Sequence, residues 1–465
     1  MTTIKSLADD LLAKHLEYAE ANDFEGLREV CGQLEMLLGE APTDPILLFT
    51  IGTSKLQMGI NGPAITYLKH ASEMAPDLPE VWNNLGTAWK HENKNEQAAA
   101  AFLKATELRE HPDFLNNIGT LYVNEGRPGD GEQFLRRAVE LDPEHPKAQW
   151  NLSLILLEQG KWREGFGKQD FGLLSGDRPN KTYGLPVWNG EPGKRVIVYG
   201  EQGMGDEVMF SSCLPDMMKD VEVVFDCHPR MKDLFKRSFG IKCFGTRKQE
   251  APGNWLNGVK ADASIAIGSL MRLYRSEGDF PRKTYLTPDP KLVARYRKKL
   301  EALGPGPYVG IGWKGGAKRT RSDLRSVKLK WFTPILEQGG TFVSVQYTDD
   351  SAGKVERFKA DSGFEIHHWP DVVENKEYDH SVALAAALDL VIVPNTTMVH
   401  VCGAIGQECW TLTPNAPAWR YGLESSEMPM YGPWVRQFRE GDSWSGLFAR
   451  VAAEYGAWKD REAAA

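Results

Sequence analysis

The chain has 465 residues, 42% of them hydrophobic and 25% charged, and its net charge is −8 at pH 7. These values are typical of a folded globular protein and argue against extensive disorder. Nucleic-acid binding needs a basic face, which the acidic overall charge does not favour. Because one hydrophobic core rarely serves so long a chain, we expect about three domains.

No apolar run is long enough to span a membrane, and the N-terminal stretch MTTIKSLADDLLAKHLEYAE is amphipathic and acid-containing, unlike a signal peptide. The six cysteines form no CxxC pairs and show no spacing typical of zinc ligands. We therefore expect a soluble, cytoplasmic protein with reduced cysteines, no disulfide framework and no metal site.

A repeat of about 34 residues runs through the N-terminal part of the chain. Its most visible mark is a Leu-Gly or Ile-Gly pair, which recurs at spacings of 34, 33 and 34 residues in Ile51-Gly52, Leu85-Gly86, Ile118-Gly119 and, as a variant, Leu152-Ser153. This spacing is typical of tetratricopeptide (TPR) repeats, in which each repeat is a pair of helices. We therefore predict an α-helical TPR solenoid over residues 1–172, with about five helix pairs.

The concave face of such a solenoid commonly binds a peptide or protein. Side-chain amides recur at repeat spacing on the predicted first helices, at Asn83, Asn84, Asn116, Asn117 and Asn151. Amides can hydrogen-bond to the backbone of an extended peptide, which predicts that these residues bind the partner. The sequence leaves a second interpretation open, in which they lie on solvated helix faces or hydrogen-bond between neighbouring repeats.

After residue 172, short β-branched runs alternate with helical stretches. The expected strands are 195–200, 221–226, 263–268, 308–313, 341–347, 388–394 and 409–414. Near-continuous apolar strands separated by helices predict parallel sheets that are covered on both faces. Because the GPGP stretch at 304–307 falls midway, we predict two doubly wound, Rossmann-like lobes at 173–303 and 304–465, with a ligand cleft at the carboxyl ends of the strands.

Three loops at predicted strand ends carry candidate binding residues. The first, GEQGMGDE at 200–207, contains Gly203 and Gly205, which allow a ligand to approach the backbone closely. A plain strand-to-helix turn is the alternative for this loop.

The second loop, at 313–330, has seven Lys or Arg residues against Asp323 alone. Cations at a strand end can hold a diphosphate, and the candidates are Lys314, Arg319, Arg321 and Arg325. A solvated basic loop is the alternative.

The third loop, PNTTMVHVCGAIG at 394–406, opens a predicted helix. Thr396, Thr397 and His400 share one face of that helix near its N-terminus, where hydroxyls and free backbone amides can bind an anion. A merely structural histidine is the alternative.

With these loops placed, a longer pattern becomes visible across residues 186–445. It consists, in order, of PVWNGEPGKRVIVYGEQGMGDEVMF, GIGWKGG, RSDLRSVKL, FVSVQY, LAAALDLVIVPNTTMVHVCGAIG, CWTLTPNAPAWRYGL, MYGPWVRQFRE and GDSW. In this order the segments resemble bacterial TPR-containing proteins whose C-terminal half is similar to family 9 (heptosyltransferase-type) glycosyltransferases of the GT-B fold. The resemblance implies that Asp206 is the general base that deprotonates the acceptor hydroxyl.

The same resemblance implies that Lys314, Thr396, Thr397 and His400 surround the diphosphate of a nucleotide-sugar donor. The chain departs from the family in one place, because it has Asn395-Thr396 where the family has Asp-Thr. An amide keeps hydrogen bonding but loses charge. The complete predicted donor site consists of Gly203, Gly205, Lys314, Arg319, Asn395, Thr396, Thr397 and His400.

We therefore expect an enzyme that transfers a sugar from a nucleotide sugar to a protein held by the repeats. It needs neither a cofactor nor a metal if cations and helix amides stabilise the leaving group. Two alternatives stay open. One is a non-catalytic TPR scaffold with a degenerate nucleotide-binding module, and the other is a transferase that acts on a glycan or a lipid-linked acceptor.

Overall fold

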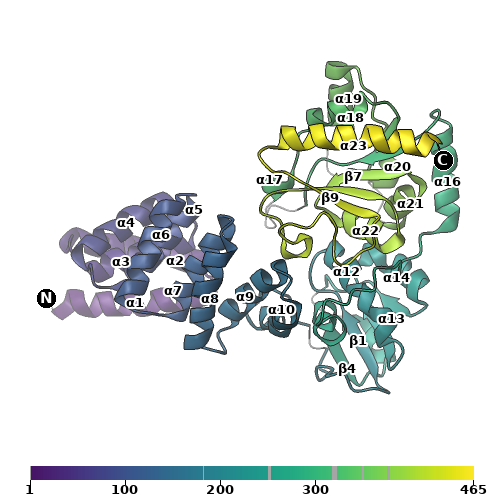
Figure 1. Ribbon diagram of the computed structural model, residues 1–465. Helices are drawn as coiled ribbons and strands as arrows, with labels where there is room; N and C mark the ends of the chain where they lie inside the picture. Colours follow the sequence, from purple (N-terminus) through teal and green to yellow (C-terminus); the bar gives the residue numbers. More distant parts are fainter. Residues whose placement is uncertain are drawn as a thin grey trace. The chain divides into compact units, whose positions relative to one another are not determined.

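The computed structural model describes residues 2–181, 183–249, 253–316, 322–347, 350–373 and 377–464 (Figure 1). The chain divides into two compact units, Met1–Leu152 and Ser153–Ala465. Throughout these described ranges, every helix is too short or too polar to cross a membrane.

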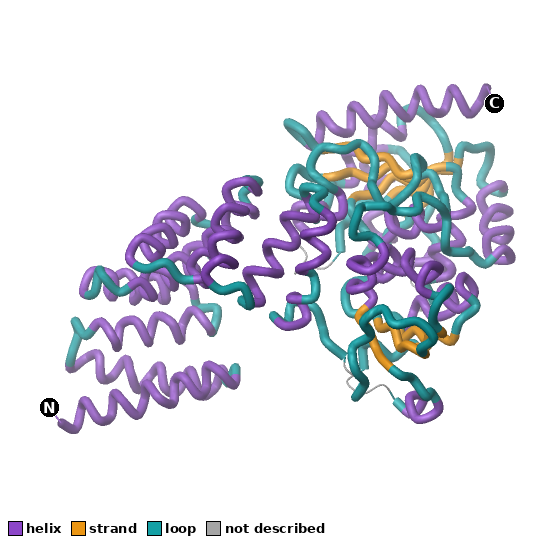
Figure 2. The backbone as a smooth tube through the Cα atoms, turned by 60° about the horizontal axis from the view of Figure 1, so that its bottom comes forward, coloured by secondary structure: helices purple, strands orange, loops and turns teal. Residues whose placement is uncertain are grey.

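The first unit is built from successive helix pairs, which Figure 2 shows as purple tubes joined by short loops. Its helices are α1 (Thr2–Ala21), α2 (Phe24–Glu40), α3 (Pro45–Gln57), α4 (Asn61–Met74), α5 (Pro79–His91), α6 (Asn95–Leu108), α7 (Pro112–Asn124), α8 (Pro128–Leu141) and the first part of α9 (Pro146–Glu158). Proline opens many of them, at a position where its missing N–H costs nothing. This arrangement confirms the predicted helical solenoid.

The repeated glycines mark the places where the two helices of a pair touch. A Cβ atom at Gly52, Gly86 or Gly119 would lie only 2.7 to 2.8 Å from the side chain of the second helix. The facing side chains are Leu68, Phe102 and Leu135. The glycines therefore recur with the repeat because each repeat has the same close contact between its two helices. Any side chain at the glycine would push these helices apart.

The second unit begins earlier than the sequence suggests. Helices α10 (Trp162–Lys168) and α11 (Phe171–Leu174) precede the sheets, and Leu157 and Phe166 lie in the core of this unit. The predicted boundary after residue 172 therefore differs from the observed division between 152 and 153. The division of the remainder at 303/304 stays a prediction.

The stretch 176–190, which precedes β1 and is rich in turn-forming residues, is attached to the first sheet. The guanidinium of Arg178 is fully buried and pairs with the carboxylate of Glu201 at 2.7 Å. The backbone N–H of Trp188, a buried residue, donates to the carbonyl of Ser264 at 2.9 Å. This part of the chain is therefore a packed segment of the α/β unit.

Two parallel sheets form the centre of the second unit. The first has the order β3-β2-β1-β4 and consists of β1 (Arg195–Tyr199), β2 (Glu222–Asp226), β3 (Lys242–Phe244) and β4 (Ala263–Ala266). The second has the order β6-β5-β7-β8-β9 and consists of β5 (Tyr308–Ile311), β6 (Thr341–Ser344), β7 (Leu390–Pro394), β8 (Cys409–Thr413) and β9 (Val435–Arg439). All seven predicted strands are present. The short β3 and the edge strand β9 escaped prediction.

Helices cover the sheets on both faces. They are α12 (Met204–Phe210), α13 (Leu214–Met217), α14 (Lys232–Phe239), α15 (Leu270–Tyr274), α16 (Pro290–Glu301), α17 (Ser322–Arg325), α18 (Thr333–Leu336), α19 (Ser351–Ser362), α20 (Pro370–Val373), α21 (Asp379–Ala387), α22 (Thr397–Ile405) and α23 (Trp444–Ala464). Helix α23 lies across the second sheet (Figure 1), and its Phe448 and Tyr455 share a core with Ile392 of β7. Every residue of β7 and β8 is buried, as expected for parallel strands covered on both sides.

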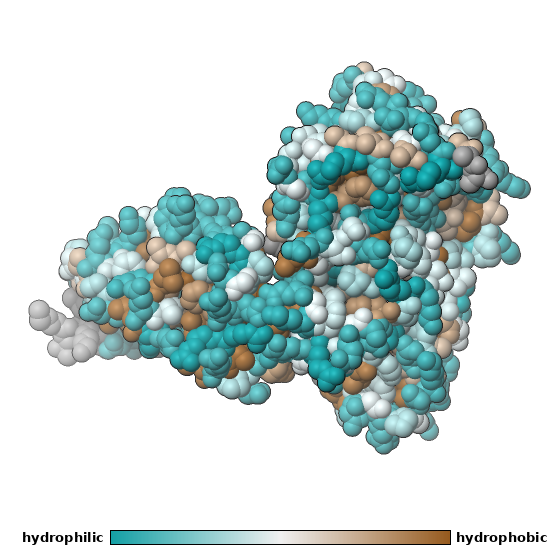
Figure 3. Space-filling view, in the orientation of Figure 1, coloured by the Kyte–Doolittle hydropathy of each residue, from teal (hydrophilic) through white to brown (hydrophobic). Residues whose placement is uncertain are grey.

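The visible surface is mostly hydrophilic, with small apolar groups scattered over it (Figure 3). Exposed large apolar side chains include Met36 and Leu16 in the first unit and Val187 in the second. Apolar side chains scattered in this way are normal on a protein surface and do not by themselves mark a binding site.

Candidate functional site

A cavity of about 580 Å³ lies within the second unit, at the carboxyl ends of strands from both sheets. Its walls come from the segments that follow five strands, and they include Asp206 after β1, Gly316 after β5, Tyr347 after β6, Asn395 after β7 and Pro414 after β8. Open α/β sheets bind ligands at this edge, because the loops there are free to vary while the strands hold them in place.

Most of the predicted site residues line this cavity. They are Gly203, Gly205, Asp206, Asn395, Thr396, Thr397 and His400. Lys314 does not line it, since its side chain is exposed and its backbone N–H donates to Oε1 of Gln346 at 2.8 Å. Arg319 and Arg321 lie outside the described residues. Of the basic loop, Arg325 reaches the cavity wall.

Asp206 occupies the third position of α12, and both of its carboxylate oxygens are engaged. Oδ2 accepts a hydrogen bond from the backbone N–H of Gly203 at 3.1 Å, which caps the helix. Oδ1 is paired with Nη2 of Arg420, in the short helical turn Trp419–Tyr421 that follows β8. Asp206 therefore caps α12, and it also has a cationic partner that sequence reasoning missed.

Arg420 could have been found by the rule that located the other loops, because it follows the end of a predicted strand. Its side chain is 15% exposed, and that of Asp206 is 17% exposed. Within the part of the chain that the structure describes, the buried Nε of Arg420 has no hydrogen-bond partner. Arg420 thus keeps a buried donor that its pairing with Asp206 does not satisfy.

His400 is buried and held by two tyrosines. Its Nδ1 lies 3.0 Å from the hydroxyl of Tyr431, and its Nε2 lies 3.4 Å from that of Tyr421. Burial, with smaller contributions from the charges of Arg420 and Arg325, lowers the pKa of His400 to about 3, whereas the charge of Asp206 opposes the shift. His400 is therefore neutral at physiological pH and provides no positive charge to a ligand.

Asn395 is buried at the end of β7 and accepts two hydrogen bonds from β8. The hydroxyls of Thr411 and Thr413 donate to its Oδ1 at 2.7 and 3.1 Å, and its carbonyl oxygen accepts from Nη1 of Arg325 at 2.9 Å. Its Nδ2 is buried without a partner among the residues described. The side chain of Asn395 is thus part of a hydrogen-bonded network through its oxygen, while both N–H donors of its Nδ2 are unused among the described residues.

The N-terminus of α22 opens on the same cavity. Thr396 is the N-cap residue with an extended backbone (φ −134°, ψ 175°), and across the described ranges its hydroxyl makes no capping hydrogen bond. Thr397 begins the helix, and both threonines line the cavity. In the first turn the N–H of Val399 donates to the carbonyl of Thr396 at 3.2 Å. The N–H groups before it, at Thr397 and Met398, have no i−4 partner within an α-helix, so this end of α22 is suited to an anion.

The asparagines of the first unit hydrogen-bond to one another. Nδ2 of Asn117 donates to Asn83, and Nδ2 of Asn151 donates to Asn116, both at 2.8 Å. Nδ2 of Asn84 donates at 3.0 Å to the hydroxyl of Thr53 in the preceding repeat. The structure thus shows hydrogen bonds between neighbouring repeats, which was the second interpretation of these residues. Their role in partner binding stays a prediction.

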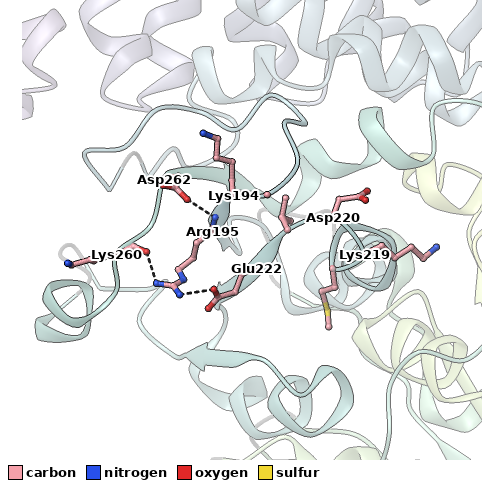
Figure 4. Close-up of a pocket in the computed structure, with 10 residues that line it drawn as sticks. Lys194, Arg195, Lys219, Asp220, Glu222, Lys260 and Asp262 are labelled. Atoms are coloured by element: carbon pink, nitrogen blue, oxygen red, sulfur yellow. Dashed lines mark hydrogen bonds and ion pairs between the residues drawn. The ribbon is translucent and has the colours of Figure 1, made fainter.

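A second cavity, of about 650 Å³, lies at the amino ends of β1, β2 and β4 (Figure 4). Figure 4 shows Arg195 at its centre, where the guanidinium pairs with Glu222 at 2.7 Å and donates to the carbonyl of Lys260 at 3.1 Å. The backbone N–H of Arg195 donates to Asp262 at 2.7 Å. These contacts engage the backbone N–H and both Nη atoms of Arg195, while its buried Nε has no partner among the residues described. The predicted site residues lie at the opposite edge of the sheet.

Comparison with known proteins gives one result for the repeats and one for most of the chain. The tetratricopeptide repeat family matches residues 79–112 and 116–165, so the N-terminal solenoid contains TPR repeats. Protein FlbA of Caulobacter vibrioides is 30% identical over 425 residues, which is 85% of this chain and 68% of FlbA. The chain belongs to the FlbA family. Because the alignment is much longer than the first unit, the relationship to FlbA extends well into the α/β unit.

Other similarities are partial. The human cell division cycle protein 16 homolog is 26% identical over 125 residues, which is 26% of this chain and 20% of that protein. The crystal structure of MamA covers 35% of this chain and 93% of MamA, with 18% sequence identity and a TM-score of 0.31.

Proposed function

We propose that this FlbA-family protein is a glycosyltransferase with a GT-B module similar to family 9, which transfers a sugar from a nucleotide sugar to an acceptor. The observation that carries the proposal is the common cavity of Asp206, Thr396, Thr397 and the N-terminus of α22. It combines one carboxylate with an anion-binding helix end, which is the pairing that a sugar transfer from a diphosphate requires.

In the proposed reaction, the acceptor hydroxyl oxygen forms a bond to the anomeric carbon of the sugar. Its proton passes to the carboxylate of Asp206, and the bond between the anomeric carbon and the diphosphate oxygen breaks. The nucleoside diphosphate leaves with the electron pair of that bond. Arg325 and the N-terminal amides of α22 stabilise the growing negative charge, so the reaction needs no metal or cofactor.

The TPR repeats supply the second part of the proposal. TPR repeats are protein-interaction scaffolds, and we infer that the solenoid holds a protein acceptor for the α/β unit. A transferase that acts on a glycan or a lipid-linked acceptor would use the same cavity. It would differ only in the acceptor that reaches this cavity.

A test is to incubate the full chain with a panel of nucleotide sugars and candidate protein acceptors, with and without EDTA. We expect release of nucleoside diphosphate, a matching mass increase on the acceptor, and no loss of either with EDTA. Transfer that stops with EDTA and returns with Mn²⁺ would contradict metal independence. Failure to bind any nucleotide sugar or nucleoside diphosphate would overturn the proposal as a whole.

The non-catalytic scaffold is a second candidate, favoured by the pairing of Asp206 with Arg420, which occupies the carboxylate. A scaffold of this kind binds nucleotide sugars without releasing nucleoside diphosphate, even when acceptors are present. Single-turnover release measured against binding under the same conditions separates the two candidates.

A further inference from the structure

The pairing of Asp206 with Arg420 joins two segments that lie 214 residues apart in the sequence. Asp206 belongs to α12, after the first sheet, and Arg420 follows β8 of the second sheet. Both residues line the cavity, and both are mostly buried. An ion pair so largely removed from water is a stronger constraint than a surface salt bridge, which is screened.

The described wall of this cavity contains few positively charged side chains. Among the described residues, the Lys and Arg side chains in its wall are those of Arg325 and Arg420. Burial lowers the pKa of Arg325, and the nearby charge of Arg420 adds to this effect. Glu201, a carboxylate in the same wall, is neutralised by Arg178 at 2.7 Å. In the described wall, an incoming diphosphate therefore meets the guanidinium of Arg420, which is bound to Asp206, and that of Arg325, which donates to the carbonyl of Asn395.

The ion pair conflicts with the role proposed for Asp206. A general base needs an oxygen that can accept the acceptor proton, yet Oδ1 is held by Arg420 and Oδ2 by the backbone N–H of Gly203. Arginine binds phosphate oxygens as well as carboxylates, often through two parallel hydrogen bonds. The buried Nε of Arg420, which has no partner among the described residues, supplies the second donor for such a contact.

We propose that Arg420 changes partner when the donor binds. Its guanidinium leaves the carboxylate of Asp206 and binds the diphosphate, so that Oδ1 of Asp206 can accept the acceptor proton. The inference rests on the proposed function and adds to it the order in which the two substrates become able to react. Asp206 becomes available as a base only after the donor occupies the cavity. Arg420 is then both a ligand of the diphosphate and a positioning residue for Asp206.

The proposal predicts a coupling between the two side chains that calorimetry can measure. The probe is whichever of UDP, ADP, GDP, CDP and dTDP the unchanged chain binds. Asp206→Asn removes the competitor for Arg420, so the nucleoside diphosphate should bind about three- to tenfold more tightly. Arg420→Ala should weaken binding by about tenfold or more. In the Arg420→Ala background, Asp206→Asn should change the affinity by less than about twofold, because no partner is left to release.

A matched control separates partner exchange from the simple loss of a negative charge. Asp177 also lines the cavity, and its carboxylate accepts a hydrogen bond from the hydroxyl of Ser175 at 2.6 Å. Asp177→Asn should alter the affinity by the same small factor with and without Arg420. Thermal unfolding of each variant checks the fold, and Arg420→Gln replaces Arg420→Ala if the alanine variant does not fold.

Three results would overturn the inference. The first is an Asp206→Asn variant that folds and binds no more tightly than the unchanged chain. The second is an equal gain in affinity when Arg420 is absent, or an equal gain from Asp177→Asn, because charge removal alone then explains the effect. The third is a chain that binds none of the five nucleoside diphosphates, which would overturn the proposed function together with this inference.

Discussion

Gly205 and His400 are in such close contact that no side chain fits between them: a Cβ atom at Gly205 would lie 2.8 Å from Cδ2 of His400 and 3.3 Å from Cα of Thr397. His400 cannot easily move aside, because Tyr431 and Tyr421 hold both of its ring nitrogens. Gly205 therefore allows α12 to pack directly against α22. The glycine was expected to bring the backbone close to a ligand, and the structure shows that it also brings two helices together.

Gly205→Ala should accordingly destabilise the α/β unit by about 1 to 3 kcal/mol, the usual cost of an extra methyl group in a packed site. Thermal unfolding measures the effect. Gly167→Ala is the control, because Gly167 lies in α10 with open space around its Cβ position. That variant should be neutral or slightly stabilising, since alanine favours a helix over glycine. Equal behaviour of the two variants would mean that α12 and α22 can separate freely.

A second prediction follows from the neutral state of His400. Its pKa is lowered to about 3 in the folded chain, against about 6.5 for an unfolded histidine. Below pH 6.5 the unfolded chain therefore binds a proton that the folded chain does not, and stability falls as the pH decreases from about 6.5 toward 3. Between pH 7 and pH 5 this contributes a loss of about 2 kcal/mol.

His400→Gln should remove that part of the pH dependence. Urea unfolding at pH 7 and pH 5 should show a smaller difference in the variant than in the unchanged chain. His228, whose pKa burial also lowers to about 3, provides a comparison site, and the two variants should act independently. An unchanged pH dependence in His400→Gln would show that the imidazole takes up its proton in the folded protein.

The sequence predicts the fold well wherever the pattern is local and periodic. Gly52, Gly86 and Gly119 recur because each repeat needs the same close contact, and β7 and β8 appear as apolar runs because both of their faces are covered. The misses have physical reasons. Strand β3 has three residues, too few for a pattern. Strand β9 is an edge strand in which buried residues alternate with partly buried ones and two of its five residues are Arg, so it has no apolar run.

The site was predictable only in part. The strand-end rule located Asp206, Thr396 and His400 in one cavity, because parallel strands present their carboxyl ends at the same edge. Which side chains pair across that cavity does not follow from any local pattern, and the partner of Asp206 is 214 residues away. The burial of Arg178 is a similar case, since its sequence neighbours are turn formers and its partner Glu201 follows the next strand.

A third prediction distinguishes two cations of the basic loop. The sequence favours Lys314 as a diphosphate ligand, whereas the structure places Arg325 in the cavity wall and leaves the Lys314 side chain exposed outside it. Arg325→Ala should therefore weaken nucleotide-sugar binding by about 1 to 3 kcal/mol, and Lys314→Ala by about 0.5 kcal/mol or less. Calorimetry gives both values. Arg325→Lys keeps the positive charge and serves as a control in case the alanine variant does not fold. A larger loss of affinity for Lys314→Ala than for Arg325→Ala would show that the diphosphate does not bind at this wall.

The last prediction concerns Asp206→Asn and the transfer step itself. Asparagine can still accept the hydrogen bond from the Gly203 N–H, so the cap of α12 and the fold should persist. It is a poor base, so transfer in a single turnover should fall by about 10²- to 10⁴-fold. Donor binding should not weaken, because the loss belongs to the chemical step and Arg420 is released from its partner. If Asp206 only caps the helix, the rate of transfer should be almost unchanged in this variant, since asparagine caps a helix as well as aspartate does. Normal transfer by a stably folded Asp206→Asn variant would therefore show that another group takes the acceptor proton.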